Sequence, residues 1–213
     1  TLLMNLTNQH PSVIADGELL GVSRRDPIGY VSGLGAAKSV QHATVQAWGF
    51  KAKWWHFTDV QDLDLDESLA WFHENNWTFV YLRRENVLKQ AISTLVGKQR
   101  QKWVFKHGEE TPEKVHIDVE NIGTYVQYRR SQLEREERAL APYDPLRITY
   151  EDDLLDDQQH QATADRVFDA LGLPSHPVKA ETRQVGGSKI ENYTSNPEDI
   201  YDEIDRLGLA YYL

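Results

Sequence analysis

The sequence predicts an α/β fold in three layers, with a mainly parallel central sheet flanked by helices. Strand-like and helix-like segments alternate along the chain, which is typical of a parallel sheet with helical crossovers. No internal repeat, low-complexity tract or glycine–serine linker interrupts this alternation. A chain of 213 residues, 40 % of them hydrophobic, is long enough to bury one ordinary core. We therefore expect a single domain over residues 1–213.

The first half of the chain shows short apolar runs between polar segments. Pro11 stops the first of them, which has the pattern of a helix end. The stretch Gly21–Val40 contains scattered glycines and arginines and yields no assignment. The elements predicted in this half are the end of a helix at 2–9, strands at 13–15, 45–51 and 78–82, and a short helix at 67–75.

The second half is richer in helical patterns. Residues 86–97 carry apolar side chains at i, i+3, i+4, i+7 and i+8, the spacing of an amphipathic helix. A long charged segment predicts a helix whose arginines, Arg129 among them, face outward. The other elements predicted here are that helix at 118–140, a strand at 146–150, and helices at 163–171 and 198–207.

The composition excludes several classes of protein. The net charge of −10 argues against a nucleic-acid partner. No cysteine is present, which excludes disulfides, thiolate catalysis and cysteine–zinc sites, and the eight scattered histidines predict no metal site. No apolar run approaches the ~20 residues of a membrane span, so we expect a cytoplasmic protein without one.

Charge is unevenly distributed within this acidic chain. Between Phe79 and Lys106 there are seven basic residues and one acid, Glu85. A solvated face is the ordinary explanation of such a run, and an anion site is the more specific one.

The segment TFVYLRRENVLKQAIS favours the anion site. A predicted strand ends, Arg83 and Arg84 follow, and a helix begins within four residues. Ligands of open α/β sheets bind at the carboxyl ends of strands, and a helix N-terminus attracts anions. Asn86, Gln90 and Ser93 share one polar helix face at i, i+4 and i+7. Arginine suits phosphate because its planar fork donates paired hydrogen bonds.

Four segments, in order, resemble the sulfotransferases that use 3′-phosphoadenosine 5′-phosphosulfate (PAPS). In chain order they are HPSVIADGELL, YLRRENVLKQAIS, ITYEDDLLDD with RVFDALGLP, and KIENYTSNPEDIYDEI with the closing YYL. The first and the last resemble the bacterial carbohydrate-type branch, the trehalose and nodulation-factor sulfotransferases. The resemblance implies a P-loop-NTPase-like sulfotransferase fold. It also implies transfer of a sulfuryl group from PAPS to a hydroxyl of a carbohydrate, glycolipid or small natural product.

The resemblance also implies which residues bind the nucleotide. Arg84 and Ser93, with Arg83 assisting, would hold the 3′-phosphate. The segment ETRQVGGSKIENY is similar to the family's C-terminal nucleotide loop, in which Arg183 and Lys189 would lie beside the phosphates. A plain surface turn is the alternative for that segment.

The same resemblance assigns the reacting end of the site. Thr1 matches the last residue of the phosphosulfate-binding loop, most of which would precede it. Glu18 matches the general base, a role that requires burial to raise its pKa. Lys51, in GFKAKWWHF, would stabilise charge on the bridging oxygen. Lys53 takes the position of the base in cytosolic-type relatives, where its high pKa makes it a poor one. His56 is a rival base close to it in sequence.

Two alternatives differ in class. One is another P-loop enzyme such as a small-molecule kinase, which needs magnesium ligands. The other is a sulfotransferase-like binding domain without activity. The expected partner is a small-molecule hydroxyl acceptor of open identity, and the oligomeric state is open, a homodimer included.

Overall fold

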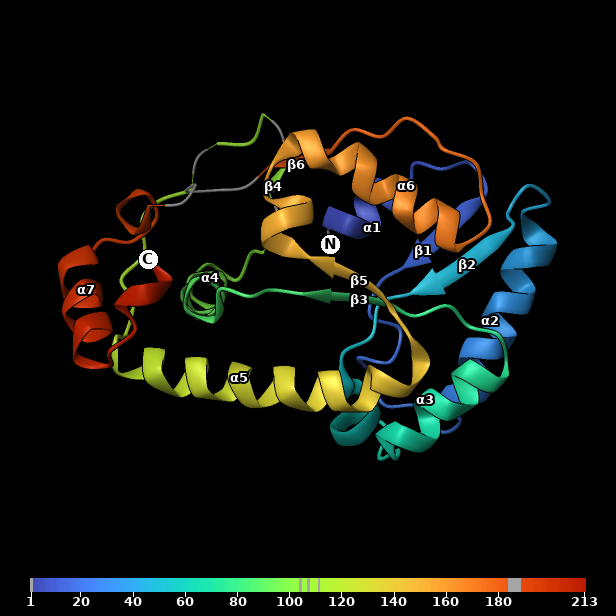
Figure 1. Cartoon of the computed structure of the whole chain (residues 1–213), viewed down its shortest axis with the longest axis horizontal. Helices are drawn as coiled ribbons and strands as arrows, with labels where there is room; N and C mark the ends of the chain where they lie inside the picture. Colours follow the sequence, from blue (N-terminus) through green and yellow to red (C-terminus); the bar gives the residue numbers. More distant parts are fainter. Residues whose placement is uncertain (1, 104, 107, 111, 184–188) are drawn as a thin grey trace. The chain divides into compact units, whose positions relative to one another are not determined.

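A computed structural model of the chain describes residues 2–103, 105–106, 108–110, 112–183 and 189–213 (Figure 1). The α/β class predicted from the sequence is confirmed, with about 55 % of the chain in helices. The helices are α1 (Leu2–Thr7), α2 (Pro27–Gln41), α3 (Leu65–Glu74), α4 (Val87–Arg100), α5 (Glu120–Leu140), α6 (His160–Ala170) and α7 (Pro197–Arg206). The strands are β1 (Val13–Asp16), β2 (Ala47–Phe50), β3 (Val80–Arg83), β4 (Phe105–Lys106), β5 (Leu146–Thr149) and β6 (Thr182–Arg183).

The described strands pair two by two. β1 and β2 run parallel, in register from Val13 opposite Ala47 to Asp16 opposite Phe50 (Figure 1). β3 pairs with β5 in a second parallel sheet, and β4 pairs antiparallel with β6. Parallel pairing therefore predominates, as expected. Within the described chain these pairs are separate, and a continuous three-layer sheet remains a prediction.

The chain divides into two compact units built from interleaved segments, where the sequence predicts one domain. The first unit comprises Thr1–Leu82, Glu136–Ile148 and Asp152–Ala180, and the second Arg83–Arg135, Thr149–Glu151 and Glu181–Leu213. Each unit has its own apolar core. In the first, a cluster of buried side chains packs against Trp48 and other aromatic rings; its buried members are Leu20, Val31, Phe57, Leu65, Leu69 and Phe72.

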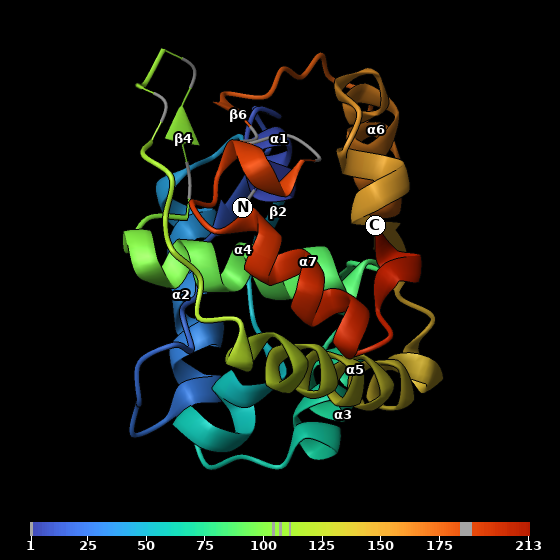
Figure 2. The same ribbon diagram turned by 90° about the vertical axis from the view of Figure 1, so that its left-hand side faces the viewer.

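Three helices supply most of the core of the second unit. Buried side chains of α4, α5 and α7 meet there, among them Ile92, Ile122 and Ile204, each with no exposed surface. Figure 2 shows the ribbons of α4, α5 and α7 close to one another. The apolar stripe predicted for residues 86–97 is the face that α4 buries, as its spacing requires.

Helix α2 lies in the stretch that yielded no assignment from sequence. Asp26 is its N-cap, accepting a hydrogen bond from the amide of Gly29 at 2.9 Å, and Pro27 occupies the first turn. The helix is only weakly amphipathic because glycine, alanine and serine fill most of its surface. Val31 is fully buried, whereas Val40 is 85 % exposed. Periodicity therefore missed a helix that its start signals could have revealed.

The prediction that Arg129 faces outward is wrong. Its side chain is half-buried on α5, and its Nε donates a hydrogen bond to Oε1 of Gln90 on α4 at 3.1 Å. Arg129 therefore joins two helices of the second unit. Arg138, near the end of the same helix, is exposed, as predicted.

Candidate functional site

The parallel pairing of β1 and β2 brings two predicted site residues to one edge of the sheet. Glu18 follows β1 by two residues, and Lys51 follows β2 directly. The amide of Lys51 donates to the carbonyl oxygens of Asp16 and Gly17 at 3.0 and 3.2 Å, which continues the pairing beyond the strands. The carboxyl ends of parallel strands meet at the same edge, where ligands of α/β proteins usually bind.

At this edge the Glu18 carboxylate is surrounded by three basic side chains. Oε1 lies 2.8 Å from Nζ of Lys51 and 3.1 Å from Nζ of Lys53. Oε2 lies 3.4 Å from Nε2 of His56. The Glu18 side chain is 35 % exposed, so it remains accessible to a small molecule. The structure thus brings together all three residues predicted to be catalytic, and Lys53 with them.

A short π-helix, His56–Val60, contributes its first residue, His56, to this cluster. His56 begins it and is only 3 % exposed. Its Nδ1 accepts a hydrogen bond from the amide of Lys53 at 3.3 Å. The ammonium of Lys53 lies 4.8 Å from the centre of the Trp55 ring, a cation–π contact. Single-turn π-helices occur frequently at functional sites.

Gln61, directly after the π-helix, holds the loop that carries Glu18. Its side chain is buried, and its Nε2 donates to the carbonyl oxygens of Leu20 and Val22 at 2.8 and 2.7 Å. Its Oε1 accepts from the amide of Arg24 at 3.0 Å. Three backbone groups of this loop therefore find hydrogen-bond partners on one side chain that is 37 or more residues away in sequence. Sequence reasoning missed Gln61 because this role depends on tertiary contact.

The electrostatics of Glu18 differ from the expectation. Burial alone would raise the pKa of its carboxyl group, but hydrogen bonds and charges from Lys51 and Lys53 outweigh burial and lower the pKa to about 2. Burial lowers the pKa of His56 below 6.5, although the Glu18 charge opposes this. At neutral pH the site therefore holds a carboxylate, two ammonium groups and a neutral imidazole.

The two oxygens of Glu18 are not equivalent. A carboxylate oxygen offers about two lone-pair sites, and Oε1 is contacted by two ammonium groups. Oε2 has one partner, His56, at the longer distance. Oε2 is therefore the oxygen that retains a site for a hydroxyl proton. Each lysine retains donors beyond the one used on Glu18, so the cluster can hold an anion and accept a proton.

Apart from Thr1, the predicted nucleotide residues belong to the second unit, and the structure pairs Arg83 and Arg84 with acids. Nη2 of Arg83 lies 2.5 Å from Oε1 of Glu85. Nε of Arg84 lies 3.5 Å from Oε1 of Glu151, and its guanidinium lies 4.4 Å from the centre of the Tyr150 ring. Glu151 also accepts the amides of Glu85 and Asn86 at 2.9 and 3.1 Å. The Glu151 carboxylate thus accepts two backbone amides at the N-terminus of α4, next to the arginines at which the sequence predicts a phosphate.

Asn86, Gln90 and Ser93, predicted to share one polar face of α4, do not contact a common partner among the residues that the structure describes. Asn86 caps α4 by accepting the amide of Lys89 at 2.8 Å and donates to the carbonyl of Tyr212. Gln90 accepts from α5, as described above. Ser93 is exposed on α4. Its role in phosphate binding remains a prediction.

The remaining predicted contributors are Arg183, Thr1 and Lys189, and the structure describes Arg183 only in its backbone. The backbone of Arg183 pairs with Phe105 in the β4–β6 ladder, and its side chain lies outside what the structure describes, as does Thr1. Residues 184–188, the glycine-containing part of the predicted loop, also lie outside it. Lys189 is exposed and precedes a short 3₁₀ turn, Ile190–Asn192.

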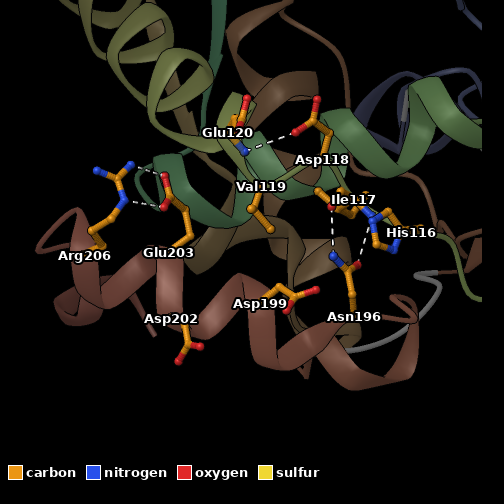
Figure 3. Close-up of a pocket in the computed structure, with 10 residues that line it drawn as sticks. All are labelled: His116, Ile117, Asp118, Val119, Glu120, Asn196, Asp199, Asp202, Glu203 and Arg206. Atoms are coloured by element: carbon orange, nitrogen blue, oxygen red, sulfur yellow. Dashed lines mark hydrogen bonds and ion pairs between the residues drawn. The ribbon is translucent and has the colours of Figure 1, made fainter.

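A separate cavity of about 480 Å³ lies in the second unit (Figure 3). It contains none of the residues predicted from sequence. Five carboxylates line it, and one of these, Glu203, is paired with Arg206 at 2.5 Å. The residues lining this cavity are His116, Ile117, Asp118, Val119, Glu120, Asn196, Asp199, Asp202, Glu203 and Arg206. The lining of this cavity is therefore mainly acidic, whereas an anionic nucleotide requires basic groups.

Comparisons with protein-family models, curated proteins and solved structures found no match for this chain. Within the described parts of the chain, no helix has the length and apolar character needed to cross a membrane. The residues that the structure describes contain no group of three or more histidine, aspartate or glutamate side chains placed to hold a metal ion.

Proposed function

We propose that the protein is a PAPS-dependent sulfotransferase, with a P-loop-like sulfotransferase fold, that sulfates a hydroxyl group of a small carbohydrate, glycolipid or natural product. The single observation that supports this most is the cluster at the carboxyl ends of β1 and β2. There an accessible carboxylate contacts two ammonium groups and a buried imidazole. Sulfuryl transfer to an alcohol needs a proton acceptor on one side and cations on the other, and this cluster offers both.

The proposed reaction is a direct displacement at sulfur. The acceptor oxygen forms a bond to sulfur, and its proton passes to Oε2 of Glu18. The bond between sulfur and the bridging oxygen breaks, and its electron pair leaves with 3′-phosphoadenosine 5′-phosphate. Lys51, with two N–H groups beyond the one on Glu18, stabilises the charge that develops on the bridging oxygen.

A carboxyl group with a pKa of about 2 is a weak base. An anionic donor would draw on the same two ammonium groups, and sharing them raises the pKa of Glu18. The base would therefore gain strength when the donor is bound. On the nucleotide side, we assign Arg84 and Ser93, with Arg83, to the 3′-phosphate, and Arg183 and Lys189 to the closing loop.

The proposal is tested with PAPS labelled in its sulfuryl group and a panel of sugars, glycolipids and small alcohols. We expect the label on at least one acceptor, and a turnover about 10²–10⁴-fold lower for Glu18→Gln. Glu74→Gln, an exposed site on α3, serves as the matched control and should keep wild-type turnover. Transfer from ATP with magnesium, and none from PAPS, would identify a kinase instead.

A binding measurement accompanies this assay. A ligand that binds only the folded state raises the melting temperature. We expect 3′-phosphoadenosine 5′-phosphate to do so, and adenosine 5′-phosphosulfate, which lacks the 3′-phosphate, to do so much less. Binding without transfer to any acceptor would indicate an inactive binding domain. Equal shifts would contradict the assigned 3′-phosphate site.

A further inference from the structure

His56 is the one buried side chain of the Glu18 cluster. It is 3 % exposed, whereas the side chains of Glu18, Lys51 and Lys53 are each about one-third exposed. Its two ring nitrogens face different partners. Nδ1 faces the backbone amide of Lys53 at 3.3 Å, and Nε2 faces Oε2 of Glu18 at 3.4 Å.

These partners determine where the imidazole proton lies. A backbone amide can only donate, so Nδ1 must be the accepting nitrogen. A neutral imidazole carries one ring proton, which therefore lies on Nε2, the nitrogen 3.4 Å from Oε2 of Glu18. The charged groups that face the ring are Glu18, Lys51 and Lys53, and burial keeps the ring neutral by lowering its pKa. In this tautomer Nε2 has no lone pair with which to take a proton from a hydroxyl group.

We infer that His56 is a positioning residue for Glu18: its Nε2–H donates to Oε2 and orients the carboxylate so that the remaining lone-pair site of Oε2 faces the acceptor hydroxyl. This inference rests on the proposed function, and it removes His56 as a rival base. The backbone amide of Lys53 fixes the tautomer, as carboxylate- or carbonyl-bound histidines are fixed in other sites. Gly21 lies beside the ring, where an added Cβ would stand 3.7 Å from Nε2.

Two variants separate positioning from base catalysis. Glutamine can place an amide N–H near the position of Nε2 but cannot act as a base, whereas leucine can do neither. We expect His56→Leu to lower kcat about 10–100-fold with little change in the KM of the acceptor. His56→Gln should recover most of that loss. The acidic limb of the pH–rate profile should persist in His56→Gln and disappear in Glu18→Gln.

A glutamine variant as inactive as the leucine variant would overturn the inference, provided both melt within a few degrees of the wild type. Should either unfold, the wild-type protein decides the matter by ¹⁵N NMR of the imidazole. We expect a protonated Nε2 and an unprotonated Nδ1 at pH 7. The opposite tautomer would refute the positioning role. The NMR measurement requires no activity, so it stands even if no sulfuryl transfer is found, in which case the proposed function fails by itself.

Discussion

The guanidinium of Arg84 and the carboxylate of Glu151 form an ion pair, with Nε 3.5 Å from Oε1. This Nε is buried and has no hydrogen-bond partner among the described residues. The same carboxylate accepts the two amides that precede α4. Glu151 therefore occupies, as an internal anion, the position at which the proposed function requires a phosphate. A phosphate that binds there has to replace the carboxylate or share its donors.

Replacing Arg84 tests the cation of this pair. We expect Arg84→Ala to weaken binding of 3′-phosphoadenosine 5′-phosphate by about 1.5–3 kcal/mol, the range for a charge-assisted hydrogen bond. Isothermal titration calorimetry measures this directly. Arg138→Ala, at an exposed position of α5, is the matched control and should bind as the wild type does. Equal affinities for the two variants would remove Arg84 from the nucleotide site.

Replacing Glu151 tests the anion. We expect Glu151→Gln to tighten binding of the same nucleotide by about 1 kcal/mol, because one like charge near the phosphate is lost. The variant should also unfold more easily, by about 0.3–1 kcal/mol, because a carboxylate stabilises a helix N-terminus. Urea unfolding provides the second quantity. Lower stability with unchanged affinity would mean that Glu151 only caps α4.

Gln61 offers a test of the loop that carries Glu18. Gln61→Leu removes three hydrogen bonds to buried or half-buried backbone groups. Leaving such groups unpaired costs about 1–3 kcal/mol each, so we expect a loss of unfolding free energy of at least that size. Gln46→Leu, at an exposed position, should change stability by less than about 0.5 kcal/mol. A small effect at Gln61 would show that another contact holds the loop.

The sequence predicted most elements because each has a strong local pattern. β1 and β2 are short apolar runs, and α4 has a clear helical period, so their existence was evident and only their ends moved. The helix α2 was missed because its surface is filled with small residues, although Asp26 followed by Pro27 marks its start.

The site was predicted in part, for a physical reason. Glu18 and Lys51 follow strands that turn out to be parallel neighbours, which a sequence pattern can anticipate. Two other contacts depend on side chains that meet only in the folded chain. They are the ion pair of Lys53 with Glu18 and the hydrogen bond that Glu151 accepts from the amide of Asn86, just before α4. The contacts of Lys51 and Lys53 with Glu18 also reversed the direction of the pKa shift expected for that carboxyl group.

Lys53→Gln tests whether the paired ammonium groups set the pKa of Glu18. The variant removes a hydrogen bond and a positive charge from Oε1, and both lower the pKa in the wild type. We therefore expect the pKa of Glu18 to rise from about 2 toward its ordinary value of 4.5. A ¹³C NMR titration of the Glu18 carboxyl group measures this. Lys179→Gln, exposed in the same unit, is the control and should leave the titration unchanged.

The same variant makes a prediction about stability and pH. A carboxyl group whose pKa is lower in the folded state stabilises the fold above its unfolded pKa, and this contribution disappears as pH falls through the folded pKa. In the wild type the loss should extend from about pH 4.5 down to about pH 2. In Lys53→Gln the contribution is smaller and is lost at higher pH, so the difference in unfolding free energy from the wild type should shrink between pH 5 and pH 2. A difference that stays constant over this range would mean that Lys53 and Glu18 do not interact in solution, and the cluster would then lose one of its two cations.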